Sequence, residues 1–227
     1  NVGKGVTDAL VNTHESVLIA RILHPDLPPH ATLADEGLLT PPSLNIHKVN
    51  LPSGDEILTL NSNFQPLTPA GQYEVASALL DCCRNSEIEK MYILAGLSAD
   101  PGCEAVHVVC SSKEDMIAME GLGISVSKEH PSAGIIGMTG MVSSLAPTFD
   151  QPSACIIAET IGTSVDTVAA DRLVQFIKNE IGLDLGLELD NTEDSANKLR
   201  AFFDLDEIAE MPADFLAEGE SQQTFYA

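Results

Sequence analysis

The chain has 227 residues, of which 44% are hydrophobic and only 4% aromatic, so its core must be built mainly from aliphatic side chains. There are 11 Lys and Arg residues against 34 Asp and Glu residues, which gives a formal net charge of -23. A chain this acidic is unsuited to nucleic-acid phosphates or to an anionic membrane surface, so we expect neither partner. The length suits one well-buried domain with an appendage.

The five cysteines show no sign of a disulfide framework. Their number is odd, two of them are adjacent, and none forms a C-x-x-C motif. This usage is typical of a reducing compartment, and no apolar run approaches the ~20 residues of a membrane span. We therefore expect a cytoplasmic protein.

The first third of the chain predicts strands. Residues 17–23 are a strand-length apolar run that ends at His24-Pro25. Prolines then mark a long irregular connection, at Pro28, Pro29, Pro41 and Pro42. Residues 44–49 and 56–60 flank a turn-forming cluster at 51–55, and this arrangement predicts an antiparallel hairpin.

The middle of the chain alternates between helix and strand signals. Thr68 followed by Pro69 predicts an N-cap and first helical position, with helical spacing to about Arg84. Residues 91–95 and 105–110 have the apolar character of buried strands.

A second group of elements follows. Ser112 is expected to cap a helix that runs to about Gly121, with Asp115 in the position of a capping-box partner. A glycine-punctuated loop at 134–140 leads into a short helix at 141–145, and a strongly apolar strand is expected at 153–158.

The last third is helical and then polar. Residues 165–181 predict an amphipathic helix whose buried face is Val168, Leu173, Val174, Phe176 and Ile177. An acidic helix is expected at 192–209, and the small and polar residues from Met211 onward predict a flexible tail.

Together these signals predict an α/β fold, with a mostly parallel sheet flanked by helices and a hairpin inserted early. The expected divisions are a core domain at residues 1–186, an acidic C-terminal helix at 187–210, and a tail at 211–227 that ends in a docking motif.

The glycines Gly134, Gly137 and Gly140 make one candidate ligand loop. Backbone N–H groups at the start of the following helix could hold an anion. Their spacing is not the dinucleotide fingerprint, and a tight turn with closely packed backbone explains the same residues. Both interpretations stay open at this point.

Other chemical signals are incomplete. Ser98 follows a strand but lacks the glycine that a nucleophile elbow needs two residues later. His107 and Cys110 would point to opposite faces of a strand, although Cys103 is near them in sequence. We therefore expect no catalytic residue, no metal site and no cofactor.

The C-terminus carries the most distinctive signal. Two aromatic residues, Phe225 and Tyr226, end a polar segment just before the terminal Ala227. They could fold back onto the domain, or they could act as a short linear motif whose terminal carboxylate is captured while the rings fill a slot.

The order and spacing of several segments resemble the proteasome assembly chaperone family, which includes the second eukaryotic assembly chaperone and its archaeal and bacterial homologues. The resemblance covers about residues 1–185. The matching segments are Asn1-Val2-Gly3, residues 58–66, Ile93-Leu94-Ala95-Gly96, residues 106–111, residues 134–141, residues 155–160, Gly162 and Ala169-Ala170.

The resemblance implies an α/β fold similar to purine nucleoside phosphorylases and a homo-oligomer without catalytic activity. It also implies that Phe225, Tyr226 and the Ala227 carboxylate dock into pockets between α-subunits of an archaeal-type proteasome core particle, as an assembly chaperone or a gate-binding factor. Family members usually carry a strand before the segment matched by Asn1-Val2-Gly3, so the chain is expected to lack its first strand. The alternative is a small-molecule binder or nucleoside-phosphorylase-like enzyme that uses the glycine loop.

Overall fold

A computed structural model describes residues 2–33, 37–127, 134–162 and 166–189 of the chain. The helices in this part of the chain are α1 (Val2–Thr13), α2 (Pro69–Asn85), α3 (Lys113–Gly121), α4 (Gly137–Leu145) and α5 (Thr167–Phe176). A 3-10 turn (Ala146–Phe149) extends α4, and a π turn (Ile177–Ile181) extends α5. The strands are β1 (Ser16–Ile22), β2 (Thr32–Leu33), β3 (Leu39–Thr40), β4 (Leu44–Asn50), β5 (Glu56–Asn61), β6 (Met91–Ser98), β7 (Val106–Val109) and β8 (Ser153–Thr160).

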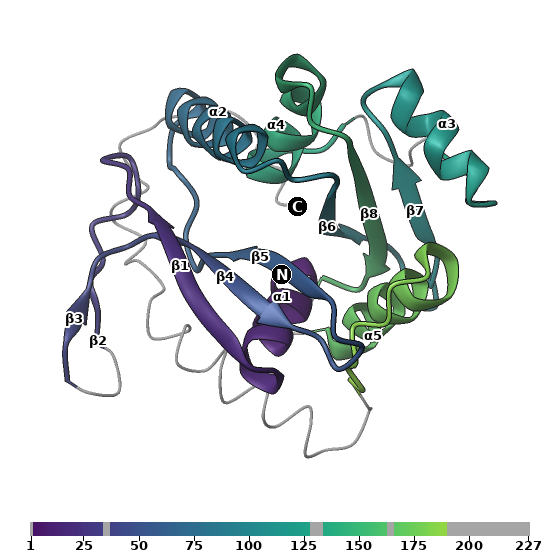
Figure 1. The fold of residues 1–227 in the computed structure, drawn as a ribbon, viewed down its shortest axis with the longest axis horizontal. Helices are drawn as coiled ribbons and strands as arrows, with labels where there is room; N and C mark the ends of the chain where they lie inside the picture. Colours follow the sequence, from purple (N-terminus) through teal and green to yellow (C-terminus); the bar gives the residue numbers. More distant parts are fainter. Residues whose placement is uncertain (1, 34–36, 128–133, 163–165, 190–227) are drawn as a thin grey trace.

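These strands form three small sheets, ordered β1-β4-β5, β2-β3 and β6-β8-β7 (Figure 1). The pairs are antiparallel except for β6 with β8, so the expectation of a mostly parallel sheet is wrong for the described residues. The reason lies in the connections. A short turn joins β4 to β5. The segment between β6 and β7, which lie on either side of β8, contains no helix that could return the chain to the other end of the sheet, so β7 runs opposite to β6 and β8.

Several predicted elements are confirmed. The hairpin of β4 and β5 is present, with Ile46 opposite Leu60 and Val49 opposite Ile57. The side chain of Thr68 caps α2 by accepting a hydrogen bond from the Gly71 N–H at 3.1 Å. Ser112 caps α3 in the same way, through the Asp115 N–H at 3.0 Å.

Other expectations need correction. The connection after β1 contains the small hairpin of β2 and β3, which is too short to leave a period-two signal in the sequence. On α5, Val168 is exposed, and Ala169 and Ala170 are buried in its place. The helix begins at Thr167, after Asp166 as N-cap, and its buried face follows the i, i+4 spacing of Ala169, Ala170, Leu173, Val174 and Ile177, which leaves Val168 outside it.

The core lies on both faces of the two larger sheets. The helices α1 and α5 pack with β8 and the end of β4, through Val6, Leu10, Val49, Ile156 and Leu173. On the other face, α2 and α4 pack against β4, β5 and β6. Strand β8 is therefore enclosed, with residues 153–158 all buried.

The segment after α5 belongs to the same body. Leu185, Leu187 and Leu189 are buried in the cluster that holds α1 and α5. The acidic helix expected at 192–209 and the tail from 211 lie outside the described residues. Among the described helices, none has the length and apolar character needed to cross a bilayer.

Candidate interaction surface and glycine loop

The candidate ligand loop is explained by backbone packing. Gly137 has a φ of +81°, a left-handed conformation that favours glycine. A Cβ on Gly140 would overlap the carbonyl oxygen of Ile135, so the first turn of α4 lies directly on the loop before it. Gly134 shows no such restriction. Two of the three glycines are therefore required by the turn itself.

A side chain of the protein already occupies the start of α4. The Oε1 atom of Gln65 accepts a hydrogen bond from the Met138 N–H at 3.3 Å. It would also lie 2.9 Å from a Cβ on Gly137. Because Gln65 is neutral and already caps the helix, this arrangement gives little support to an anion site.

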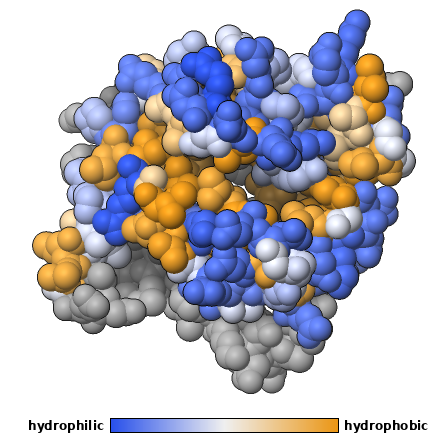
Figure 2. Space-filling model, in the orientation of Figure 1, coloured by the Kyte–Doolittle hydropathy of each residue, from blue (hydrophilic) through white to orange (hydrophobic). Residues whose placement is uncertain are grey.

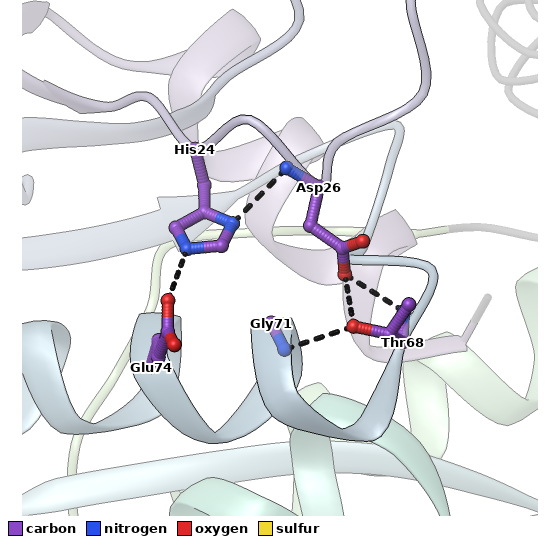
Figure 3. Close-up of polar contacts among 5 residues, drawn as sticks. All are labelled: His24, Asp26, Thr68, Gly71 and Glu74. Atoms are coloured by element: carbon purple, nitrogen blue, oxygen red, sulfur yellow. Dashed lines mark hydrogen bonds and ion pairs between the residues drawn. The ribbon is translucent and has the colours of Figure 1, made fainter.

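The start of α2 is capped by more side-chain contacts than the start of α4 (Figure 3). Asp26 Oδ2 accepts hydrogen bonds from the Thr68 N–H at 2.7 Å and from the Thr68 hydroxyl at 2.8 Å. The hydrogen bond from the Thr68 N–H is the main reason that the pKa of Asp26 lies below its ordinary value. His24 joins this group, since its Nδ1 accepts from the Asp26 N–H at 3.2 Å and its Nε2 lies 2.9 Å from Glu74 Oε2. Sequence reasoning identified Thr68 as the cap but missed the carboxylate that binds it from 42 positions away.

The carboxyl end of β8 holds a third polar group. Glu159 lies 3.1 Å from His107 Nε2 and accepts from the Ala105 N–H at 2.9 Å, and these hydrogen bonds hold its pKa below the ordinary value. Arg172 donates to the carbonyl oxygens of Glu159 and Cys103. His107 thus contacts a carboxylate, and Arg172 is engaged by backbone oxygens.

A fourth polar group, which sequence reasoning did not find, lies between α1 and β5. Asp8 accepts from Lys4 Nζ at 2.6 Å and from Asn61 Nδ2 at 2.7 Å. His47 is close by, and burial is the largest reason that its pKa is lowered. These contacts fasten α1 to the sheet.

The described residues offer little for nucleophilic or metal chemistry. Among them, no group of three or more His, Cys, Asp or Glu side chains is placed to hold a metal ion. Burial raises the pKa of the Cys155 and Cys83 thiols to about 11, so both stay protonated near neutral pH. Ser98 lies beside Gly162 at the end of β6.

Apolar side chains are exposed at several places on the described surface, and two of these places are the β1-β4-β5 sheet and the hairpin of β2 and β3. Val17 and Ile19 of β1 are 54% and 51% exposed, and Leu58 of β5 is 45% exposed. Val17 and Leu58 both lie opposite Lys48, so they share one face of the sheet. In the hairpin of β2 and β3, Leu33 pairs with Leu39, and both are exposed. We call Val17, Ile19, Leu33, Leu39 and Leu58 the apolar patch, and Figure 2 shows hydrophobic surface over β1 and over this hairpin.

The docking tripeptide, Phe225, Tyr226 and Ala227, lies outside the described residues. Its role therefore stays a prediction from the sequence.

Comparison with known proteins identifies relatives along nearly the whole chain. The model of the PAC2 family matches residues 1–201. A curated relative, the uncharacterized protein MJ1210 of Methanocaldococcus jannaschii, is 22% identical over 205 residues, which are 90% of this chain and 78% of the relative.

Solved structures share the fold. Pyrococcus furiosus PbaA, described as an archaeal homolog of proteasome-assembly chaperone, has a TM-score of 0.70 and 23% identity, over 92% of this chain and 90% of its own. Pyrococcus furiosus PbaB, described as an archaeal proteasome activator, has a TM-score of 0.69 and 14% identity, over 92% and 88%. A Thermoplasma acidophilum protein of unknown function has a TM-score of 0.72 and 20% identity, over 96% and 84%.

Proposed function

This chain belongs to the PAC2 family, and from that premise we propose that it is a non-catalytic protein that binds the proteasome core particle through its C-terminal residues. The fold is shared with a homolog of proteasome-assembly chaperone and with a proteasome activator, and these likenesses support a proteasome partner. The observation that carries the proposal is the combination of this family body with the terminal sequence Phe225-Tyr226-Ala227. The proposed site of action is the cytoplasm.

Docking of the tail has a simple physical basis. The terminal carboxylate binds a basic group or backbone N–H groups in a pocket between neighbouring α-subunits, and the two rings fill the space beside it. Burying one ring is worth roughly 1.5–3 kcal/mol, whereas ordering each tail residue costs about 1–2 kcal/mol. A single tail therefore binds weakly.

Several tails on one assembly bind more tightly, because each docking event after the first is intramolecular. The apolar patch supports such an assembly, and we propose that a second copy of the chain covers it. The patch consists of exposed apolar side chains, and the nearby Lys48 is paired with Glu56, so this surface carries little net charge in a chain whose net charge is -23.

The contacts in the described residues favour this role over catalysis. The first turn of α4 is bound by Gln65, and Arg172 is bound by backbone oxygens. Neither arrangement supports the anion binding that a phosphorolytic enzyme needs. We therefore do not propose a small-molecule reaction at the glycine loop.

Co-sedimentation with purified archaeal core particles tests the proposal. The intact protein should pellet with the core particle, and a variant without residues 225–227 should stay in the supernatant. Adding one glycine after Ala227 should also abolish binding, since it moves the carboxylate while it retains both rings. The matched control is Gln222→Ala with Gln223→Ala, which changes the same tail and should bind normally. Equal binding by all variants would show that the folded body carries the interaction and would contradict tail docking.

A further inference from the structure

The connection between β1 and the hairpin of β2 and β3 is held against α2 by a small number of contacts (Figure 3). Its residues 23–31 form neither a helix nor a strand. Leu27 is buried in one cluster with Val75 of α2. The Asp26 carbonyl oxygen accepts from the Leu67 N–H at 3.1 Å, just before the start of α2. The position of the connection therefore depends on these contacts and on the side chains of His24 and Asp26.

The sequence of α2 leaves room for the Asp26 carboxylate. Gly71 is the third residue of this helix, although glycine is less favourable in a helix than alanine because it loses more backbone freedom on folding. A Cβ at this position would overlap Asp26 Oδ2. The glycine thus allows the carboxylate to lie over the first turn of α2. This close fit indicates that the contact between the connection and α2 is a specific feature of the fold.

The contacts of His24 determine where its ring carries a proton. The Asp26 N–H donates to His24 Nδ1 at 3.2 Å, and a backbone N–H can only donate, so Nδ1 carries no proton. The ring proton is then on Nε2, which donates to Glu74 Oε2 at 2.9 Å. The ring that makes both contacts is therefore the neutral imidazole.

The charged form of the ring cannot make the same pair of contacts. Imidazolium carries a proton on both nitrogens and accepts no hydrogen bond, so a proton on Nδ1 would face the Asp26 N–H. The side chain of His24 is only 16% exposed, so the ring and the main chain of Asp26 must move apart before water reaches the new proton. The contact of Nε2 with Glu74 persists and becomes an ion pair.

Two carboxylates lie near this ring. Glu74 comes from α2, and Asp26 comes from the connection itself. The hydrogen bond from the Thr68 N–H is the largest cause of the lowered pKa of Asp26, and the charge of His24 also contributes. Both carboxylates favour the charged ring, whereas the Asp26 N–H favours the neutral ring. The two forms of His24 therefore favour different positions of the connection.

We propose that the contact between His24 and the Asp26 N–H is a pH-dependent switch that holds the hairpin of β2 and β3 in place when the ring is neutral and releases it when the ring is charged. Histidine is the side chain that changes its charge between about pH 5 and pH 8. The hairpin has only two residue pairs, and Leu33 and Leu39 are exposed, so it depends on the connection for its position. The inference does not depend on the proposed function.

Nuclear magnetic resonance of the intact chain between about pH 8 and about pH 5 tests the proposal. At the upper pH, the nitrogen signals of His24 should show a neutral ring with its proton on Nε2. As the pH falls, the ring of His24 and the amide of Asp26 should change with one midpoint, because one hydrogen bond joins them. The backbone order parameter of Leu39 should fall from about 0.85 to below about 0.6. The amides of α3, on the opposite side of the molecule in Figure 1, should not change.

Two substitutions at His24 separate its two forms. Asparagine can accept from the N–H two positions later but cannot titrate, so His24→Asn should keep Leu39 ordered at both pH values. Lysine is charged at both pH values and accepts no hydrogen bond, so His24→Lys should leave Leu39 flexible at both. The matched control is His30→Gln, in the same connection, where the ring of His30 lies 5.6 Å from that of Phe64. This variant should respond to pH as the unchanged protein does.

Two results would overturn the proposal. The first is an ordered Leu39 at about pH 5 in the unchanged protein while the ring of His24 is charged. The second is the same loss of order in His24→Asn as in the unchanged protein. In that case, abolition of the response in His30→Gln would assign the switch to His30 instead.

Discussion

The two larger sheets differ in how completely helices cover them. In the β6-β8-β7 sheet, residues 153–158 of the middle strand are all buried, between α1 and α5 on one face and α4 on the other. In the β1-β4-β5 sheet, Ile46 is buried under α2, but Val17 and Leu58 on the same face are exposed. The β6-β8-β7 sheet is thus enclosed by the fold, whereas the β1-β4-β5 sheet leaves part of its apolar area exposed.

Truncating a buried side chain of β8 should have the largest effect on stability. Ile156 is fully buried, so Ile156→Ala should lower the free energy of unfolding by about 2–5 kcal/mol through lost burial and a cavity. Chemical denaturation measures the change. Ile117→Ala on α3, where the side chain is 65% exposed, is the control and should change stability by less than ~0.5 kcal/mol. A similar loss of stability in both variants would contradict the greater contribution of the buried strand β8.

Substitutions at exposed apolar residues of the β1-β4-β5 sheet should weaken self-association rather than folding. The double change Val17→Ser and Ile19→Ser removes two apolar contacts from the proposed interface, so self-association should weaken at least about tenfold while the monomer stays folded. Analytical ultracentrifugation measures the association. Ile117→Ser with Leu122→Ser removes at least as much exposed apolar surface from α3 and its C-cap and should leave association unchanged. Loss of association in the control alone would move the interface to α3.

The enclosed sheet also carries a pH-dependent contact at its end. Burial opposes ionisation of Asp166, but hydrogen bonds from the Thr160 hydroxyl at 2.6 Å and the Ala169 N–H at 2.9 Å lower its pKa. A lowered pKa stabilises the fold above about pH 4, and the contribution is lost as the pH falls through the folded-state value.

The variant Asp166→Ala should therefore cost about 0.5–2 kcal/mol at neutral pH, and its difference from the unchanged protein should shrink as the pH falls below about 4. Thermal unfolding across pH measures this difference. Asp166→Asn can still accept from the Ala169 N–H but cannot titrate, so its stability relative to Asp166→Ala should not vary with pH. A constant difference between Asp166→Ala and the unchanged protein would contradict the role of ionisation.

The smallest effect on stability is expected from the ion pair on the exposed face of the β4-β5 hairpin. Lys48 Nζ lies 2.6 Å from Glu56 Oε1, and both side chains are largely exposed to solvent. Lys48→Met should lower the free energy of unfolding by only ~0.2–1 kcal/mol, and ~1 M salt should remove the difference by screening. Because methionine enlarges the apolar patch, association should not weaken. Weaker association would show that the charge of Lys48 takes part in the interface.

Local signals predicted the elements well but not their arrangement. Thr68-Pro69 and Ser112 identified helix starts because capping depends on residues within one turn. The direction of each strand depends on how it is connected to the others. The alternation of strand and helix signals predicted parallel strands, but no helix lies between β6 and β7, and β7 is antiparallel.

The polar contacts of the candidate sites were beyond local reasoning. Gln65 binds the start of α4 from 73 positions away, and Asp26 binds Thr68 from 42 positions away. Hydrophobic periodicity cannot predict such pairs, because they form only when elements distant in sequence pack together. The role of Phe225, Tyr226 and Ala227 rests on the sequence and on the resemblance alone.

The packing of α1 against α5 also affects how the chain folds during synthesis. More than 150 positions separate Thr13 at the end of α1 from Thr167 at the start of α5. At ~5–20 residues per second, a ribosome needs on the order of ten seconds or more to make this stretch, and contacts so distant in sequence form slowly. During that time the apolar side of α1, with Val6 and Leu10, has no partner helix. A protein of this architecture is thus itself exposed to aggregation until its C-terminal half has been made.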